Sequence, residues 1–176
     1  MSSVHLVACH HDRHAEAILA IFNDAIAHST ALYDYRPRTA QSMATWFEAK
    51  RAGGFPVLGL ENDAGELLGF ASYGPFRAFP AFKYTVEHSV YVRQDQRGRG
   101  WGRDLMQALI AEARRHEVHA LIGAIDADNT GSIALHRRLG FQHAGTLPQV
   151  GFKFGRWLDL ALYQLLLETP AQPVDG

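Results

Sequence analysis

Hydrophobic positions recur along the chain at two spacings, and each spacing predicts one type of element. Spacing of three and four residues predicts a helix, whereas alternation or a short apolar run predicts a strand. Helices are expected after Asp12 and Thr39, which can act as N-caps, after the glycines at 98–102, and after Asn129. Strands are expected at 5–8, 57–61, 67–76, 85–92, 120–125, 142–146 and 157–167.

The connections between these elements predict one compact domain. Gly65 lies in the short segment between the strands at 57–61 and 67–76, which indicates an antiparallel hairpin ahead of the central strand, unlike the start of a Rossmann fold. The polar and aromatic loop at 30–38 is expected to be a lid over a site. We expect a single domain over residues 1–168 and a disordered tail at 169–176.

The stretch at 85–103 carries the clearest chemical pattern. Its first eight residues are mostly β-branched and aromatic, which favours a strand. Gly98, Gly100 and Gly102 follow at every second position among arginines, and a helical pattern begins at Leu105. Glycines let backbone N–H groups approach an anion, and a helix N-terminus favours negative charge. The pattern predicts a site for a phosphate-bearing ligand, most simply a nucleotide-type cofactor.

The glycine spacing separates this loop from two common nucleotide-binding motifs. A dinucleotide fold has G-x-G-x-x-G and a P-loop has G-x-x-x-x-G-K-[ST], and Gly98-x-Gly100-x-Gly102 matches neither. Arg97-x-x-Gly100-x-Gly102 instead resembles the R/Q-x-x-G-x-G/A pyrophosphate loop of the GNAT superfamily of acyl-CoA-dependent N-acetyltransferases. The run at 129–141 resembles the second cofactor-contacting helix of that superfamily, and it follows the loop in the same order.

A finer resemblance covers nearly the whole chain, from about residue 5 to residue 167. The segments at 72–77, 85–92 and 150–157 resemble the phosphinothricin and methionine sulfoximine N-acetyltransferase subgroup. The resemblance implies an α+β fold with a mostly antiparallel sheet of six or seven strands, flanked by about four helices. In that sheet the strands at 85–92 and 120–125 run parallel and splay apart.

The same resemblance implies an activity. We expect a cytoplasmic detoxification enzyme that transfers the acetyl group of acetyl-CoA directly, in a ternary complex, to the α-amine of a small amino-acid analogue. Methionine sulfoximine, methionine sulfone and phosphinothricin are the expected substrates. A homodimer is also implied, in which the 150–157 loop approaches the neighbouring site.

By resemblance, one set of residues holds the cofactor. Backbone groups of the strand at 85–92 hydrogen-bond the pantetheine arm, and the Val90 N–H polarises the thioester carbonyl. Residues 97–103, here called the arginine–glycine loop, bind the pyrophosphate. The implied cofactor-binding residues are Val90, Tyr91, Val92, Arg97, Gly98, Arg99, Gly100, Trp101, Gly102, Arg103, Asn129 and Ser132.

Acetyl transfer to an ammonium group requires a base, and Glu87 is the best candidate. It is a carboxylate within an otherwise apolar strand, and burial would raise its pKa toward neutrality. In the resembled subgroup the matching glutamate is taken as the base, acting through water. The alternative is a carboxylate at a strand edge that faces solvent. His88 points to the opposite face of the strand, as either a second proton carrier or a hydrogen-bonded core histidine.

The departing thiolate requires a proton, and His136 is the candidate acid. The superfamily most often has tyrosine at this position, but histidine can also donate a proton near pH 7. Two alternatives stay open: an exposed helix histidine without a role, and protonation by solvent. Asn129 likewise is either the N-cap of its helix or a contact to the pantetheine amide.

The substrate end is expected around Arg77, where a strand ends. A guanidinium can pair bidentately with a carboxylate, sulfone or phosphinate, and phenylalanines nearby can wall an aliphatic side chain. A surface arginine is the alternative. The predicted substrate-binding residues are Arg77, Phe79, Glu87, His88 and Ser89, with Phe76 and Phe82 completing an apolar sleeve.

Composition argues against several other functions. The net charge is −1 and the pI is about 6.8, which disfavours binding to nucleic acid. The histidine clusters at 10–14 and 116–119 lack the third ligand of a zinc site, so no metal is expected. Cys9, the single cysteine, is interpreted as a small apolar residue, and it favours the cytosol because no internal disulfide can form. No signal peptide or membrane-spanning segment is expected.

Two other functions remain as alternatives. The first is an N-acetyltransferase for another small amine or a protein N-terminus. Polyamines and aminoglycosides would require an acidic pocket, whereas the segment after residue 73 carries Arg77 and Lys83. The second is a non-catalytic acyl-CoA-binding sensor, and the presence of Glu87 argues against it.

Overall fold

The protein is described by a computed structural model covering residues 3–176, which divide into two compact units. Of the described residues, unit 1 comprises 3–72 and Ser89–Leu109, and unit 2 comprises Tyr73–His88 and Ile110–Gly176. The central strand therefore contributes its first half to unit 2 and its second half to unit 1. A single domain over residues 1–168 stays a prediction.

The described residues form seven strands and four α-helices, and the predicted fold class is confirmed. The strand order is β1-β2-β3-β4-β5-β7-β6. β4 and β5 pair in parallel, and the pairs β1–β2, β2–β3, β5–β7 and β6–β7 are antiparallel. The elements are β1 Val4–Ala8, α1 His11–His28, α2 Ala40–Gly53, β2 Val57–Asn62, β3 Leu67–Pro75, β4 Thr85–Val92, α3 Trp101–Arg115, β5 Ala120–Asp126, α4 Thr130–Arg138, β6 Gln142–Lys153 and β7 Arg156–Leu166.

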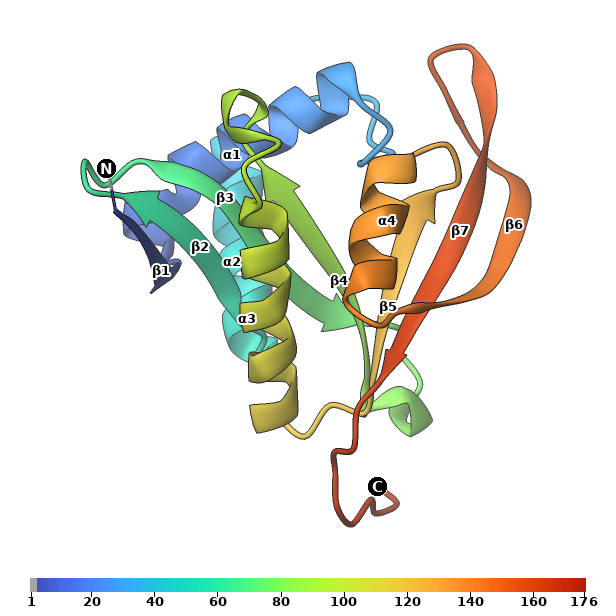
Figure 1. Ribbon diagram of the computed structural model, residues 1–176. Coiled ribbons are helices and arrows are strands. Elements are labelled where there is room, and N and C mark those ends of the chain that lie inside the picture. Colours follow the sequence, from blue (N-terminus) through green and yellow to red (C-terminus); the bar gives the residue numbers. More distant parts are fainter. Residues whose placement is uncertain (1–2) are drawn as a thin grey trace. The chain divides into compact units, whose positions relative to one another are not determined.

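Unit 1 is built around an aromatic core. Figure 1 shows α1 and α2 on one face of β1–β3 and the start of α3 on the other. The Phe22 ring packs edge-on against Phe70 and Tyr91, with centroid distances of 5.0 and 5.3 Å. Phe22 and Phe70 are buried, and each contributes about 1.5–3 kcal/mol. The core therefore ties α1 to the second half of β4, which carries Tyr91.

A glycine in β3 allows α3 and β4 to pack closely. A Cβ at Gly69 would lie 2.7 Å from the Tyr91 carbonyl oxygen and 3.3 Å from Leu105 Cδ1. Only glycine therefore leaves room for this approach, which sets the position of β4 where it leads into the arginine–glycine loop.

Unit 2 packs α4 against the strands β5 and β7 (Figure 1). Thr85–His88 of β4 pair with Ala120–Gly123 of β5, and β5 in turn pairs with β7 over its whole length. The splaying of β4 from β5 stays a prediction. The buried hydrophobic residues of this unit include Val86, Leu121, Phe141, Leu158, Ala161 and Tyr163.

The start of α1 and the end of β6 differ from the prediction. The N-cap of α1 is His10, not Asp12, and Asp12 lies within the first turn. β6 continues to Lys153, beyond the predicted end at residue 146. Pro148 favours a strand end at that point, but the register shifts between Leu147 and Gly151 and the pairing with β7 then resumes.

Several smaller expectations are confirmed. Thr39 forms a capping box with Ser42 at the start of α2, and Cys9 is a buried residue directly after β1.

The loop at 30–38 is attached to α1, because the Arg38 N–H donates to the Asn23 side chain at 2.7 Å. Its role as a lid stays a prediction.

The end of the chain contacts other segments of unit 2. The Val174 N–H donates to the Tyr84 hydroxyl at 3.2 Å, and His119 Nδ1 lies 2.9 Å from the Thr169 carbonyl oxygen. Within the described part of the chain, no helix is both long enough and apolar enough to cross a membrane.

Candidate active site

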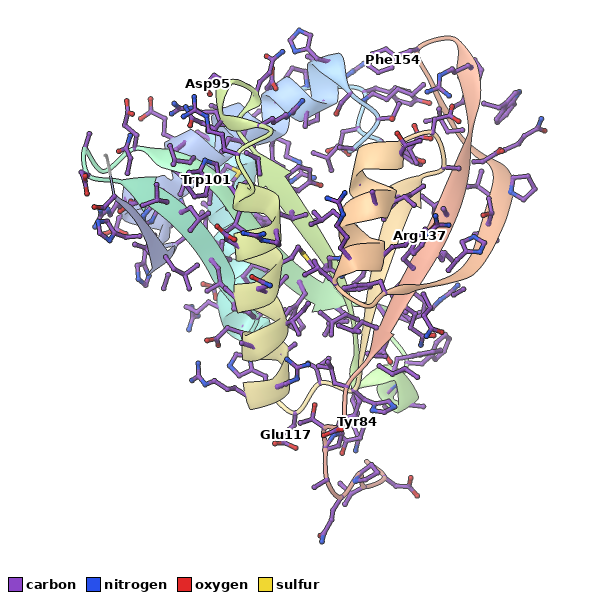
Figure 2. The ribbon with its side chains drawn as sticks, viewed as in Figure 1. Tyr84, Asp95, Trp101, Glu117, Arg137 and Phe154 are labelled. Atoms are coloured by element: carbon purple, nitrogen blue, oxygen red, sulfur yellow. The ribbon has the colours of Figure 1, made fainter. Side chains whose placement is uncertain are left out.

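The arginine–glycine loop in unit 1 has the backbone geometry of an anion site. Gly98 and Gly100 have φ angles of 77° and 90°, a backbone conformation that residues with a Cβ rarely adopt. A Cβ at Gly98 would meet no atom, so the backbone conformation and not lack of space requires glycine there. Residues 101–103 of the loop form the start of α3, whose first residue is Trp101 (Figure 2).

The first turn of α3 completes this site. The N–H groups of Arg103 and Asp104 donate to the Gly100 carbonyl at 3.0 and 3.2 Å. The N–H groups that precede them in a first turn have no intrahelical acceptor, and they concentrate the positive end of the helix dipole. These N–H groups suit a phosphate.

Arginine side chains surround the loop and are exposed. Arg97 is held by its neighbours: its Nε donates to the Val92 carbonyl at 3.3 Å, and its Nη2 lies 3.9 Å from Asp24. Arg99 and Arg103 are also exposed, and Arg103 contacts Asp104 at 3.2 Å. Exposed arginines with such weak pairs can exchange them for a phosphate, which they bind with charge-assisted hydrogen bonds. Asp24 was not predicted, because its contact with Arg97 spans 73 positions.

Unit 1 thus brings together the predicted cofactor residues from Val90 to Arg103. Val90, Tyr91 and Val92 are half-buried at the end of β4. The loop follows them after a short 3₁₀ turn at Gln94–Gln96, which includes Asp95 (Figure 2).

Glu87 lies in the part of β4 that belongs to unit 2. It is opposite Ile122 in the parallel pair with β5, so it is on a central strand and not at a strand edge. The side chain keeps substantial exposure, yet partial burial raises the pKa of its carboxyl group. A carboxylate with a raised pKa that still meets solvent can accept a proton from a bound amine, directly or through water.

His88 and His136, here called the histidine pair, meet in the interior of unit 2. Their Nε2 atoms are 2.8 Å apart, and the rings are nearly parallel with a centroid distance of 5.1 Å. Both residues are buried, with 6% and 3% of their surfaces exposed. This burial excludes the alternative of an exposed helix histidine at 136, because α4 turns this residue toward β4.

A glycine and a phenylalanine that sequence reasoning missed make room for the histidine pair. A Cβ at Gly123 would lie 3.1 Å from His88 Cε1 and 3.2 Å from His136 Nε2. Phe141 packs against both rings, at centroid distances of 5.1 and 5.0 Å. A glycine inside a strand is a sign of close approach by another group, so Gly123 was the available signal.

Burial also determines the charge of the pair. It lowers the pKa of His88 to about 3, with a further contribution from His136. It lowers the pKa of His136 as well, although the hydrogen bond to the Ser132 carbonyl acts in the opposite direction. Both rings are therefore neutral at pH 7.

Asn129 and Ser132 lie at the start of α4. The Asn129 side chain is the N-cap and accepts a hydrogen bond from the Ser132 N–H at 3.1 Å, which confirms the structural role predicted for Asn129. The Ser132 carbonyl lies 2.7 Å from His136 Nδ1 and so orients that ring. The cofactor contacts of both residues stay predictions.

The predicted substrate residues of unit 2 form a looser group. Arg77 is exposed and lies over the Phe76 ring at 5.8 Å. Phe76 packs against Phe82 at 5.7 Å, whereas Phe79 is 70% exposed. The apolar sleeve around a substrate stays a prediction. Among residues 3–176, no three histidine, cysteine, aspartate or glutamate side chains are placed to share a metal ion.

Comparison with known proteins identifies relatives over most of the chain. The model of the acetyltransferase (GNAT) family matches residues 16–141. An L-methionine sulfoximine/L-methionine sulfone acetyltransferase of Pseudomonas paraeruginosa is 52% identical over 151 residues, which cover 86% of this chain and 88% of that protein. A phosphinothricin N-acetyltransferase of Alcaligenes faecalis is 39% identical over 149 residues, covering 84% of this chain and 75% of that protein.

A solved structure agrees with these relatives. An acetyltransferase from Salmonella typhimurium, determined with its cofactor acetyl-CoA, is 42% identical and superimposes with a TM-score of 0.93. The match covers 98% of this chain and 99% of that structure.

Proposed function

Since this chain belongs to the acetyltransferase (GNAT) family, we propose that it acetylates the α-amine of a small amino-acid analogue. The expected family, the acyltransferase class and the acetyl-CoA cosubstrate are confirmed. The observation that carries the proposal is the arginine–glycine loop, where glycines of positive φ precede the N-terminus of α3 among exposed arginines. This geometry fits the pyrophosphate of acetyl-CoA.

The proposed substrates are methionine sulfoximine, methionine sulfone and phosphinothricin. Support comes from relatives named for these compounds, at 52% and 39% identity. The polar tips of these analogues accept hydrogen bonds, so a site with donors for them would discriminate against plain methionine, which would leave the donors unpaired. Arg77, exposed beside Phe76, is the proposed donor. Phe79, His88 and Ser89 are the other proposed substrate-binding residues.

In the proposed reaction Glu87 is the base. It removes a proton from the substrate ammonium group, and the free amine then attacks the thioester carbonyl. The Val90 N–H stabilises the developing oxyanion, and the pantetheine arm pairs with the strand from Val90 to Val92. The assignment of His136 as the acid that protonates the thiolate stays a prediction.

The experiment is a substrate screen with the purified protein. Acetyl-CoA is supplied with each of the three analogues, with methionine, with spermidine and with a peptide amine, and release of the CoA thiol is followed over time. We expect rapid release with the three analogues and slow release with methionine. Faster acetylation of spermidine or of the peptide would refute the substrate class, and absence of release with every amine would favour an acyl-CoA-binding sensor.

We also propose that two copies of this chain pair through the β6–β7 hairpin. The described residues of the hairpin leave a row of large apolar side chains exposed, between 46% and 60%. Phe154 lies at the turn of the hairpin (Figure 2). Apolar patches of this kind mark interfaces more often than free surface. The row consists of Leu147, Val150, Phe152, Phe154 and Trp157.

The pairing is tested by mass in solution. The native chain should sediment as a dimer, and Trp157→Glu should convert it to a monomer, because a charge at the interface core is costly to bury. Leu166→Glu changes a residue of equal exposure, 60%, outside the row and should leave the dimer intact. A native chain that stays monomeric at high concentration would contradict the proposal.

The cytoplasm, where a single cysteine stays reduced, is the proposed compartment.

A further inference from the structure

A second cavity-lining region of unit 1 lies outside the predicted cofactor site. The cavity has a volume of about 470 Å³, which is within the range of small-molecule sites. Its walls come from the segment between β1 and α1, from α2, and from the segment that enters β2. The described residues that line it are Cys9, His10, His11, Ala44, Phe47, Glu48, Lys50, Arg51, Phe55 and Val57. None of them belongs to the arginine–glycine loop.

Lys50 brings an amine into the apolar part of this cavity. The side chain is half-buried near the end of α2. Its Nζ lies 5.3 Å from the centroid of the Trp46 ring and 5.9 Å from that of the Phe55 ring. An aromatic ring attracts an ammonium group by about 0.5–1 kcal/mol at such sites. The rings also displace water from the amine, and loss of water disfavours the charged form.

The other ionisable groups of the cavity add no net negative charge. Arg51 donates to both carboxylate oxygens of Glu48, at 2.6 and 2.9 Å, so the charge of Glu48 is balanced. Burial raises the pKa of the Cys9 thiol to about 12, so this thiol is neutral at pH 7. His10 and His11 are exposed at the rim and are neutral or positive. The lining residues therefore do not favour the ammonium form electrostatically.

We propose that Lys50 is a modification site, at which the cavity presents a neutral amine to acyl thioesters, acetyl-CoA among them, and the amine becomes acetylated. Burial lowers the pKa of Lys50 to about 8, so about a tenth of the amine is neutral at pH 7. An ordinary lysine is neutral in only about one molecule in 2,500 at this pH. The inference goes beyond the proposed function and does not depend on it, because the amine attacks the thioester without the proposed base Glu87.

The proposed step converts a thioester and an amine into an amide and a thiol. The lone pair of Lys50 Nζ attacks the thioester carbonyl carbon, and the N–C bond forms. The C–S bond breaks and the sulfur leaves as a thiolate. The nitrogen loses one proton, which passes through water to the thiolate. The exposed rim of the cavity admits the thioester from solvent.

The chain contains three lysines, so it supplies its own controls. Lys83 is exposed, with its Nζ 5.1 Å from the Tyr84 ring centroid. Lys153 is only 4% exposed, with its Nζ 4.9 Å from the Phe154 ring centroid. All three amines therefore lie near an aromatic ring and differ in exposure. Access alone would make Lys83 the most reactive of the three, whereas the proposal makes Lys50 the most reactive.

The first test labels the purified native protein at pH 7 with isotope-labelled S-acetyl-N-acetylcysteamine, a short acetyl thioester. Peptide mass spectrometry follows each lysine over time and separates it from the N-terminal amine of the chain. We expect Lys50 to be acetylated at least about tenfold faster than Lys83, because the larger neutral fraction outweighs the lower nucleophilicity of a less basic amine. Equal or faster labelling of Lys83, or no labelling of Lys50, would overturn the proposal.

The second test measures the labelling rate of Lys50 against pH. The rate should level off at alkaline pH with a midpoint near pH 8, where the amine loses its proton. A midpoint above about pH 9, toward the ordinary range of lysine, would overturn the proposal. This readout does not depend on how easily the probe enters the cavity, because access changes the height of the curve and not its midpoint.

The third test repeats the labelling with acetyl-CoA. The order of the three lysines should be the same, and a Lys50 that reacts with the short thioester but not with acetyl-CoA would overturn the proposal. The short thioester lacks the pyrophosphate, so its reaction does not require the arginine–glycine loop. A protein that acetylates no amine in the substrate screen but is labelled first at Lys50 would refute the proposed function and support this inference.

Discussion

Replacement of Glu87 by glutamine is the most direct test of the proposed chemistry. The two side chains have nearly the same size, and residue 87 pairs with Ile122 through backbone groups that the substitution leaves intact. Glu87→Gln therefore removes the ability to accept a proton and little else. We expect kcat to fall by about 10²–10⁴-fold, which is the usual contribution of a general base. At 1.36 kcal/mol per tenfold change, this equals about 3–5 kcal/mol of transition-state stabilisation.

The pKa of Glu87 predicts how stability should respond. Partial burial raises the pKa of this carboxyl group above its value in the unfolded chain. The folded state then binds the proton more readily, so the stability from this group is present below the unfolded pKa and is lost as pH rises through the folded pKa. At pH 7 the ionised carboxylate opposes folding, and Glu87→Gln should therefore leave the melting temperature unchanged or slightly higher.

The assay records initial rates against pH with saturating acetyl-CoA, alongside thermal unfolding at pH 7. In the native enzyme kcat/KM should fall on the acidic side as Glu87 takes up a proton, and this acidic limb should disappear in the variant. Glu16→Gln, an exposed residue on α1, is the control and should keep both the rate and the limb.

Two results would refute this reasoning. A Glu87→Gln enzyme with full rate and an intact acidic limb would show that the base lies elsewhere. A loss of rate accompanied by a clearly lower melting temperature would indicate a structural role for Glu87.

Three further predictions concern the cofactor loop, the substrate end and the histidine pair. Arg97→Ala combined with Arg99→Ala should raise the KM for acetyl-CoA by about 10- to 100-fold with little change in kcat, because charge-assisted hydrogen bonds of about 1.5–3 kcal/mol are lost. Unchanged acetyl-CoA affinity by calorimetry would exclude a pyrophosphate site, and Arg114→Ala is the control. Arg77→Ala should weaken binding of methionine sulfone by about 10- to 100-fold while acetyl-CoA affinity stays the same, and equal binding by titration would remove Arg77 from the site. Gly123→Ala should lower kcat and cost about 1–3 kcal/mol in chemical denaturation, because its Cβ would lie 3.1 Å from the His88 ring; a fully active and stable variant would show that the ring contact is dispensable.

Several features of this protein follow from short stretches of sequence. The capping box of Thr39 and Ser42 depends on four consecutive residues, and the sequence contains them all. Gly98 and Gly100 have positive φ angles, as their spacing ahead of a helix indicates. The expected family also rests on local motifs, because an anion site made of backbone N–H groups needs only a loop and the helix after it.

Other features depended on packing between distant segments. The sequence predicted the end of β6 before Pro148, but pairing with β7 extends the strand to Lys153. Alternation along β4 places His88 on the same face as the buried Val86, so this orientation could be predicted from the sequence. The hydrogen-bond partner of His88 could not be predicted, because His136 is 48 positions away on a helix beside two arginines.

The histidine pair shows most clearly what only the tertiary structure decided. Its geometry needs the missing side chain of Gly123, the ring of Phe141 and the Ser132 carbonyl, which lie on three different segments of unit 2. The pKa values of both rings follow from the loss of water around them. Sequence alone identifies a histidine that can carry a proton, but desolvation and the position of each hydrogen-bond partner arise only when the chain has packed.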